Sequence, residues 1–194
     1  IVYIPHFMSW VVAASIFSMI LSPTSAGFVN DILMKLHLIT DNIYFLGDQK
    51  WWRFSYYIIN VWKDTGWGTI IFMATLAGIS PELYEAASMD GANRFQKMIY
   101  ITLPALNNTI VTVLVLNLAK VMNLFESVFV LQNDAVIKVS DVLQTYIYTQ
   151  TFNSGAIPDY GYTTAVGMFS SIISCILVLV CNRVSHKTRG RGIV

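Results

Sequence analysis

The sequence predicts an all-α integral membrane protein, a multi-span helical bundle with about four membrane crossings and further helices at the membrane surface. Of the 194 residues, 55% are hydrophobic and 12% are charged, and this charged fraction is about half that of a typical soluble domain. The mean hydropathy is +0.58. This composition excludes a disordered chain, an ordinary soluble domain and a nucleic-acid-binding protein. We therefore expect lipid to be the main solvent.

Four segments are expected to cross the bilayer, since a crossing takes about 20 predominantly apolar residues. They cover residues 1–22, 56–79, 105–131 and 163–182. Lys63 and Asp64 fall within the second segment, and Lys120 and Glu126 fall within the third. The four segments are expected to form a single transmembrane domain over 1–194. Because the chain begins without Met or a basic leader, we expect its N-terminus to be incomplete.

Basic residues in the short connections predict the side of the membrane that each connection occupies. The tail 183–194 has four basic residues, and the connection 80–104 adds Arg94 and Lys97. With four crossings these two segments share a side, whereas the opposite connections have four basic residues and six Asp. The excess predicts that the connection 80–104 and the basic tail 183–194 are cytoplasmic.

Two further helices are expected in the connections on the outer side. Residues 28–39 have apolar side chains at helical spacing, which predicts a short amphipathic helix at the membrane interface. Residues 141–152 predict a second, half-buried helix. The start of the second crossing is crowded with aromatic residues, namely Trp51, Trp52, Tyr56 and Tyr57. Such a cluster is typical of the aromatic belt of membrane proteins.

The connection 80–104 predicts two short helices joined by a turn. Ser80 suits the cap position of the first helix, and Pro81 suits its first helical position. Glu82 and Glu85 fall in or near the first turn, where the helix dipole favours anions.

The second half of this connection contains the signals for the turn and the second helix. Gly91 is expected to end or bend the first helix. A second helix is expected over 93–102, running to Pro104, which would stop it or begin the third crossing. We therefore expect a helix–turn–helix at the cytoplasmic surface.

A set of residues in this connection resembles the EAA loop of binding-protein-dependent ABC importer permeases. The set has the spacing E-A-A, three residues, G, nine residues, I, one residue, L-P, and consists of Glu85, Ala86, Ala87, Gly91, Ile101, Leu103 and Pro104. Asp90 and Ala92 add the D-G-A form that is common in the family. The resemblance implies that the loop docks into a cleft on a separate cytoplasmic ATPase and transmits its nucleotide-driven closure. The expected ATPase-coupling residues are these nine together with Glu82.

Looser matches outside the loop are similar to permeases for sugars and oligosaccharides. They lie at Phe125-Glu126, Val130-Leu131, Thr145 to Tyr148, Phe152 and Gly161 to Ala165. The opening IPHFMSWVV and the segment 62–67 resemble the polysaccharide/alginate-type branch most. Permeases of this family usually carry more crossings than the four expected here, in agreement with an incomplete N-terminus.

The resemblance also implies the partners. The chain would form half of a membrane path for a sugar or oligosaccharide, together with a second homologous permease. An ABC ATPase dimer would bind on the cytoplasmic side, and an extracytoplasmic solute-binding protein would deliver the substrate. The sequence has no Walker A motif, so ATP and Mg are expected on the partner ATPase, with no cofactor and no enzymatic activity in this chain. The implied location is a bacterial cell membrane, with the C-terminus in the cytoplasm.

Four polar residues recur at every third position near the end of the third expected crossing, namely Asn117, Lys120, Asn123 and Glu126. On one continuous helix they would form a spiral polar stripe, which is too costly to face lipid. The stripe would either line the substrate path, with Asn123 as the best single candidate, or bond to neighbouring helices. Lys63 and Asp64 are expected to anchor or pair near the outer interface.

Two other classes of function fit the sequence less well. An ATP-independent secondary transporter or channel would use the polar stripe as an ion path, but it has no use for the EAA spacing. A membrane-embedded enzyme needs clustered nucleophiles, bases or metal ligands, and His6, His37 and His186 are isolated in the sequence. Cys175 and Cys181 would point to different faces of one helix, so neither a disulfide nor a metal site is expected.

Overall fold

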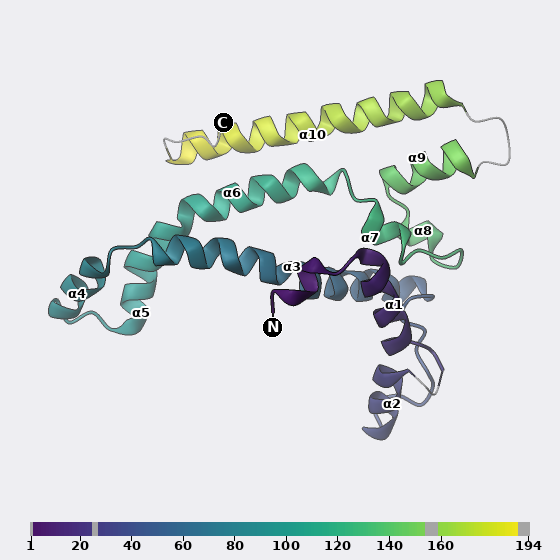
Figure 1. Ribbon diagram of the computed structural model, residues 1–194, viewed down its shortest axis with the longest axis horizontal. Helices are drawn as coiled ribbons and strands as arrows, with labels where there is room; N and C mark the ends of the chain where they lie inside the picture. The colour runs from purple at the N-terminus through teal and green to yellow at the C-terminus, as the bar shows by residue number, and fades with distance from the viewer. Residues whose placement is uncertain (1, 25–26, 154–158, 190–194) are drawn as a thin grey trace. The chain divides into compact units, whose positions relative to one another are not determined.

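The computed structural model describes residues 2–24, 27–153 and 159–189, with side chains as far as Arg183, and within these residues every regular element is a helix (Figure 1). The predicted all-α fold class is therefore confirmed. The chain forms two compact units, Ile1–Thr65 with Met122–Ile173 and Gly66–Val121 with Ser174–Val194. The long helices α3 (Gln49–Ala77) and α10 (Tyr160–Arg189) contribute residues to both units.

The first unit combines the beginnings of α3 and α10 with short helices. These are η1 (Ile4–Phe7), α1 (Trp10–Ile20), α2 (Phe28–Lys35), α7 (Glu126–Phe129), α8 (Ile137–Ser140) and α9 (Leu143–Phe152). Helix α2 confirms the helix expected within 28–39, although it ends at Lys35. Helix α9 confirms the helix expected over 141–152.

A buried core holds the first unit together around the first turns of α3. The rings of Trp52 and Tyr56 stack with their centroids 5.1 Å apart. Trp52 Nε1 donates to the Leu131 carbonyl at 3.0 Å, and the hydroxyls of Tyr56 and Ser127 are bonded at 2.9 Å. Trp52 and Tyr56 are only 3% and 8% exposed, whereas Tyr57 is 63% exposed. The expected aromatic belt is therefore wrong for Trp52 and Tyr56, because their polar groups find buried partners instead of the membrane interface.

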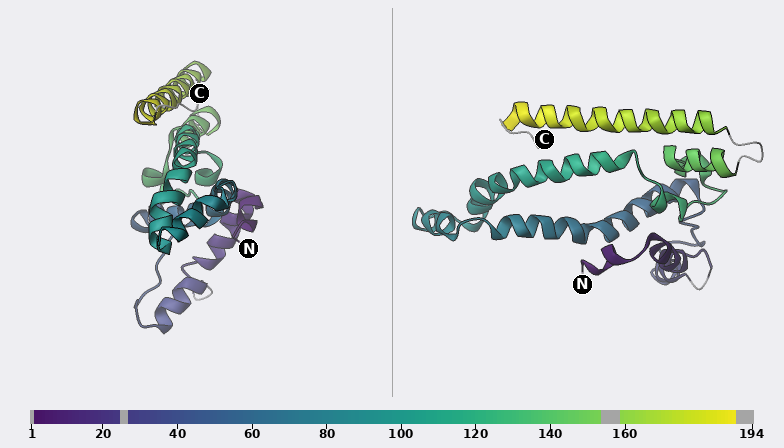
Figure 2. Two further views of the ribbon diagram at one scale, coloured as in Figure 1. Left: turned by 90° about the vertical axis from the view of Figure 1, so that its left-hand side faces the viewer. Right: turned by 45° about the horizontal axis from the view of Figure 1, so that its top comes forward.

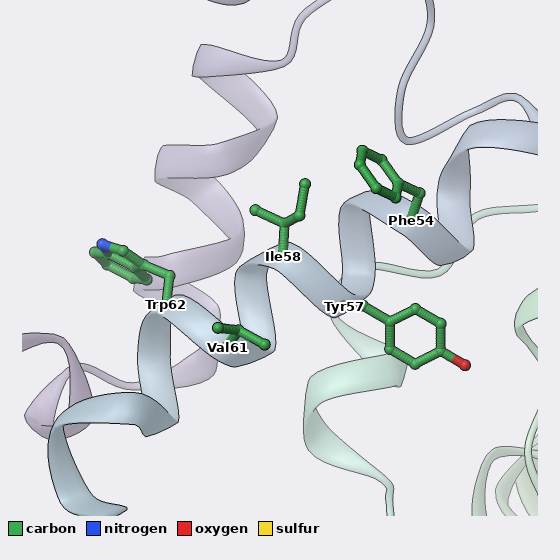
Figure 3. A pocket seen from close by; sticks show the side chains of 5 residues that line it. All are labelled: Phe54, Tyr57, Ile58, Val61 and Trp62. Atoms are coloured by element: carbon green, nitrogen blue, oxygen red, sulfur yellow. The ribbon is translucent and has the colours of Figure 1, made fainter. Parts of the chain in front are cut away.

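Further along α3, the same unit exposes a stripe of apolar side chains. A shallow groove of about 350 Å³ is lined by Phe54, Tyr57, Ile58, Val61 and Trp62 (Figure 3). The Trp62 ring packs edge-on against Phe17 of α1, with 5.1 Å between centroids. An almost entirely apolar lining suits lipid chains or another helix rather than a polar ligand.

The second unit combines the rest of α3 and α10 with a helix pair and a long helix. Helix α4 (Pro81–Met89) is followed by α5 (Arg94–Lys97), the π-helical segment η2 (Met98–Thr102) and α6 (Leu103–Val121). The last three elements are continuous and form one helical run over Arg94–Val121. The hydroxyls of Thr75 in α3 and Thr109 in α6 are bonded at 2.8 Å.

Within the described residues, two helices are long and apolar enough to cross a bilayer, Arg94–Val121 and Tyr160–Arg183. They overlap the third and fourth expected crossings. Helix α3 has 29 residues, enough length to cross, but it contains several charged and amide side chains, so its crossing remains a prediction. Helix α1 has 11 residues, about 16 Å at 1.5 Å per residue, and is shorter than the roughly 30 Å hydrocarbon core.

Two segments that were expected to be single helices are interrupted. Within 1–22, the extended residues Met8 and Ser9 separate η1 from α1, and Ser9 Oγ accepts from the Val12 N–H at 3.3 Å to start the new helix. Within 105–131, α6 ends at Val121 and a new helix begins only at Glu126.

Side-chain partners explain the end of α6. The Met122 carbonyl accepts from Gln144 Nε2 at 3.3 Å and from Ser170 Oγ at 3.5 Å. These donors take the place of the N–H groups that another helical turn would provide. An uncharged apolar run predicts a helix but does not detect such donors elsewhere in the chain.

Candidate functional site

The candidate site is the helix pair of the second unit, over residues 80–104, where the ATPase-coupling residues are expected. Helix α4 begins with Pro81, and Glu82 lies in its first turn. Pro81 lacks an N–H that the first turn would leave unbonded, and Glu82 interacts favourably with the helix dipole. Ser80 occupies the cap position as predicted, but within the described structure its side chain makes no capping hydrogen bond.

A tight turn at Gly91 ends α4, as the sequence predicts. Gly91 has a φ of 78°, in the left-handed region that only glycine adopts without steric cost. The Gly91 N–H bonds to the Ser88 carbonyl at 3.1 Å, and the Ala92 N–H bonds to the Ala87 carbonyl at 2.9 Å. These two bonds form a Schellman motif. A Cβ added at Gly91 would meet nothing within 4 Å in the described part of the chain, so the backbone conformation alone requires glycine.

A capping box starts the second helix of the pair directly after the turn. Asn93 Oδ1 accepts from the Gln96 N–H, and Gln96 Oε1 accepts from the Asn93 N–H, both at 2.8 Å. The sequence analysis missed this feature, although Asn-x-x-Gln after a glycine turn is a recognisable signal. The box fixes the point at which the chain re-enters a helix.

The second helix does not stop at Pro104. It widens into the π-helical turn η2, in which the Leu103 N–H bonds to the Met98 carbonyl, and it then continues as α6. Proline has no N–H and its ring collides with the carbonyl four residues earlier in a regular helix. The wider π turn immediately before Pro104 accommodates that ring, and such turns are frequent at functional sites.

Side-chain hydrogen bonds tie α4 to the second helix. The hydroxyls of Tyr84 and Thr102 are bonded at 2.9 Å. Lys97 Nζ donates to Ser88 Oγ at 2.6 Å, and Ser88 Oγ donates to the Tyr84 carbonyl at 2.7 Å. The sequence analysis missed these four residues; the spacing of Tyr84 and Ser88 on one helical face was the available signal. They hold the helix pair in one geometry.

The opposite side of α4 is open. At 100° per residue, Glu82, Glu85, Ala86 and Met89 cluster on the side away from Tyr84 and Ser88. We call these four residues the outer face of α4. All four are exposed, and Met89 is exposed to 88%. The outer face combines two carboxylates, a small residue and an apolar tip.

The remaining coupling residues divide into half-buried and exposed positions. Half-buried positions are Ala87, Ala92 and Ile101. Exposed positions are Asp90, Gly91, Leu103 and Pro104. The EAA pattern therefore mixes residues that build the turn and the helix contact with residues that are accessible to a partner.

The four path candidates do not form the expected stripe. Asn117 and Lys120 are exposed on α6 in the second unit, whereas Asn123 and Glu126 follow the end of that helix and belong to the first unit. Asn123 Oδ1 accepts from Gln144 Nε2 at 3.4 Å. A stripe on one continuous helix is therefore wrong, because α6 ends between the second and third members.

Lys63 is buried against neighbouring residues, whereas the side chain of Asp64 is 63% exposed beside His6. Lys63 is 5% exposed; its Nζ donates to the His6 carbonyl at 3.1 Å and lies 5.1 Å from the centre of the Trp10 ring. Asp64 Oδ1 lies 3.5 Å from His6 Nδ1. The expectation of anchoring or pairing is confirmed for Lys63, and the carbonyl and the ring face offset part of the cost of burying its ammonium group.

Comparison with known proteins shows the family of the chain. The sequence model of the family "Binding-protein-dependent transport system inner membrane component" matches residues 1–190. The chain is 40% identical over 193 residues to Protein LplB of Bacillus subtilis, covering 99% of this chain and 59% of that protein. It is 38% identical over 194 residues to the polygalacturonan/rhamnogalacturonan transport system permease protein YteP of the same organism, covering 100% of this chain and 59% of that protein.

Solved structures give the same result. A bacterial ABC transporter involved in the import of the acidic polysaccharide alginate has a chain with a TM-score of 0.90 and 36% identity, covering 97% of this chain and 64% of that one. A complex of the bacterial alginate ABC transporter with an alginate pentasaccharide-bound periplasmic protein gives a TM-score of 0.91 at 36% identity, covering 100% of this chain and 65% of that one. The chain thus spans less than two thirds of the length of these relatives. It belongs to the family of binding-protein-dependent transport system inner membrane components, with the helical fold of the type I ABC importer permeases.

Proposed function

We propose that the protein is the permease subunit of an ATP-driven importer and forms half of the membrane path for a sugar or oligosaccharide. The observation that carries the proposal is the outer face of α4, which projects from a rigid helix pair at the position of the EAA spacing. A second homologous permease would complete the path. A solute-binding protein would deliver the substrate, in keeping with a binding-protein-dependent family.

The outer face of α4 has the chemistry of a docking surface for an ATPase subunit. Glu82 and Glu85 can pair with basic groups at the rim of a cleft, and Ala86 permits close approach of the two backbones. Met89 provides an apolar, flexible tip that can fill a pocket. We infer a partner cleft with an apolar floor and a basic rim. ATP and Mg would bind to that subunit, and this chain would contribute no cofactor and no catalytic group.

The substrate class rests on the named relatives. One is named for polygalacturonan and rhamnogalacturonan, and another imports alginate, which is described as acidic. We therefore propose an acidic oligosaccharide as the substrate. Asn117, Lys120, Asn123 and Glu126 remain the proposed path residues, and Lys120 is the one whose charge suits a sugar carboxylate.

The proposed orientation places the helix pair 80–104 and the C-terminus in the cytoplasm of a bacterial cell. The basic tail directly after the last crossing supports it. The alternative of a secondary transporter or channel has no use for the EAA spacing of the helix pair 80–104.

Charge reversal on the outer face tests the proposal in the full-length permease. Glu85→Lys combined with Met89→Ala should reduce copurification with the ATPase and uptake of labelled oligogalacturonate together, because both substitutions remove contacts to the cleft. Asp134→Lys, an exposed acidic position in the first unit, is the control for copurification and should leave association with the ATPase unchanged. Full association and full uptake in the outer-face variant, with normal membrane insertion, would contradict the proposed docking.

A further inference from the structure

Helix α2 presents an apolar stripe to its surroundings. Phe28, Ile32 and Leu36 are spaced four residues apart, so each is rotated by only about 40° from the last around the helix axis. Their exposed fractions are 62%, 38% and 62%, and Leu38 beyond the helix is exposed to 67%. We call Phe28, Ile32 and Leu36 the apolar stripe of α2. A contiguous exposed apolar patch of this kind marks a contact with a membrane or with another protein.

Buried contacts on another side hold α2 rigidly. Asn30 is 1% exposed; its Nδ2 donates to the carbonyls of Ser22 and Ile43, both at 2.9 Å, and its Oδ1 accepts from the Ile43 N–H at 3.0 Å. A Cβ added at Gly27 would lie 2.0 Å from the Ser22 carbonyl oxygen. The chain on both sides of α2 is therefore closely packed against it, and the direction of the apolar stripe is fixed by the fold.

A charged edge runs beside the apolar stripe. Lys35 Nζ pairs with Asp31 Oδ2 at 2.7 Å, and the Lys35 side chain is 74% exposed. An aliphatic stem next to apolar residues with a solvated ammonium at its end is the arrangement that snorkels at a membrane surface. The charged face and the apolar face of α2 are therefore neighbours around the helix axis.

Helix α2 runs across the direction of α10 and of α3, as Figures 1 and 2 show from two sides. The comparison applies within the first unit, which contains α2, the beginning of α3 and the beginning of α10. The part Tyr160–Arg183 of α10 is apolar and long enough to cross the bilayer. A helix that lies across such a crossing lies along the membrane plane.

We propose that α2 is an interfacial helix whose apolar stripe inserts into the boundary between lipid headgroups and acyl chains. Lys35 then reaches the phosphate layer beside the inserted stripe. Such helices bury their apolar face about 5–10 Å into this boundary. The helix anchors the first unit at a fixed depth, so that the beginnings of α3 and α10 keep their level in the membrane.

Ile32 and Met34 provide a matched test. Their exposed fractions are 38% and 37%, but two residues along a helix correspond to about 200°, so they lie on opposite faces. The full-length permease, in its assembled transporter with the native cysteines replaced by serine, would carry Ile32→Cys or Met34→Cys labelled with an environment-sensitive fluorophore. It would be reconstituted in vesicles of phosphatidylethanolamine and phosphatidylglycerol that contain brominated lipids.

Quenching by shallow bromines should be several-fold stronger at Ile32 than at Met34, without binding protein or nucleotide. Equal quenching at the two positions would overturn the proposal. Shielding of Ile32 from lipid in the reconstituted transporter would also overturn the proposal. Shielding of Ile32 that appears only after binding protein is added would overturn it as well, because the stripe would then be a protein interface. The readout needs no transport, so it is independent of whether the proposed substrate or the ATPase docking is correct.

Discussion

Replacing Gly91 tests whether the turn after α4 requires glycine for its backbone conformation or for its lack of a side chain. At a φ of 78°, an alanine would cost roughly 1–2 kcal/mol, the penalty of a left-handed conformation for a residue with a Cβ. That energy corresponds to a change of roughly 5- to 30-fold in the population of the native turn. Asparagine is larger than alanine but tolerates this region better, so Gly91→Asn should disturb the turn less than Gly91→Ala.

Hydrogen exchange of the Ala92 amide, which bonds to the Ala87 carbonyl at 2.9 Å, reports directly on the turn. In the assembled transporter, exchange should accelerate roughly 5- to 30-fold in Gly91→Ala and less in Gly91→Asn, with uptake falling in the same order. Gly78→Ala is the control: its Cβ would lie 3.4 Å from the Thr75 carbonyl oxygen and its φ is not in the left-handed region. If asparagine is worse than alanine, side-chain size decides, and a partner surface rather than φ requires the glycine.

Three further predictions have defined outcomes. Tyr84→Phe and Thr102→Val each remove the hydroxyl pair at 2.9 Å, so a double-mutant cycle on uptake or thermal stability should give a coupling of about 0.5–1.5 kcal/mol; additive effects would show that the bond contributes nothing. Gly27→Ala places a Cβ 2.0 Å from the Ser22 carbonyl oxygen and should destabilise the purified permease by about 1–3 kcal/mol in thermal unfolding. His37→Gly relieves a φ of 55° and should stabilise the permease by about 0.5–1 kcal/mol after the entropic cost of glycine is subtracted; an unchanged melting temperature would argue against strain at His37.

Local signals predicted the backbone of the helix pair 80–104 well, because its geometry is set within a few residues. Pro81 begins α4, Gly91 ends it with a left-handed turn, and a second helix follows. These features depend on the backbone chemistry of the residues themselves. The capping box at Asn93 was equally local and could have been predicted from the same rules.

The errors share a different cause, which is contact between distant parts of the chain. Trp52 is buried because the Leu131 carbonyl, 79 residues away, accepts its indole N–H. The end of α6 depends on donors from Gln144 and from Ser170 to Met122. Composition and periodicity describe a segment in isolation, so they predict helices in these places but not where the helices end or which side chains are buried.

Two side-chain ties of α4 stiffen a helix pair that is interrupted by a π turn, and the proposed coupling to an ATPase requires such stiffness. Lys97 immediately precedes η2, and Thr102 is its last residue. Ser88 therefore holds α4 to one end of the π turn, and Tyr84 holds it to the other end. The Thr102 hydroxyl also donates to the Lys97 carbonyl at 3.4 Å, across the π turn itself. A wide turn before a proline is the natural place for a helix to bend. Here the bonds to α4 at both ends of the turn oppose such bending. In the proposed coupling to an ATPase, a push on the outer face of α4 would be carried into the continuous helix Arg94–Val121 as a rigid movement.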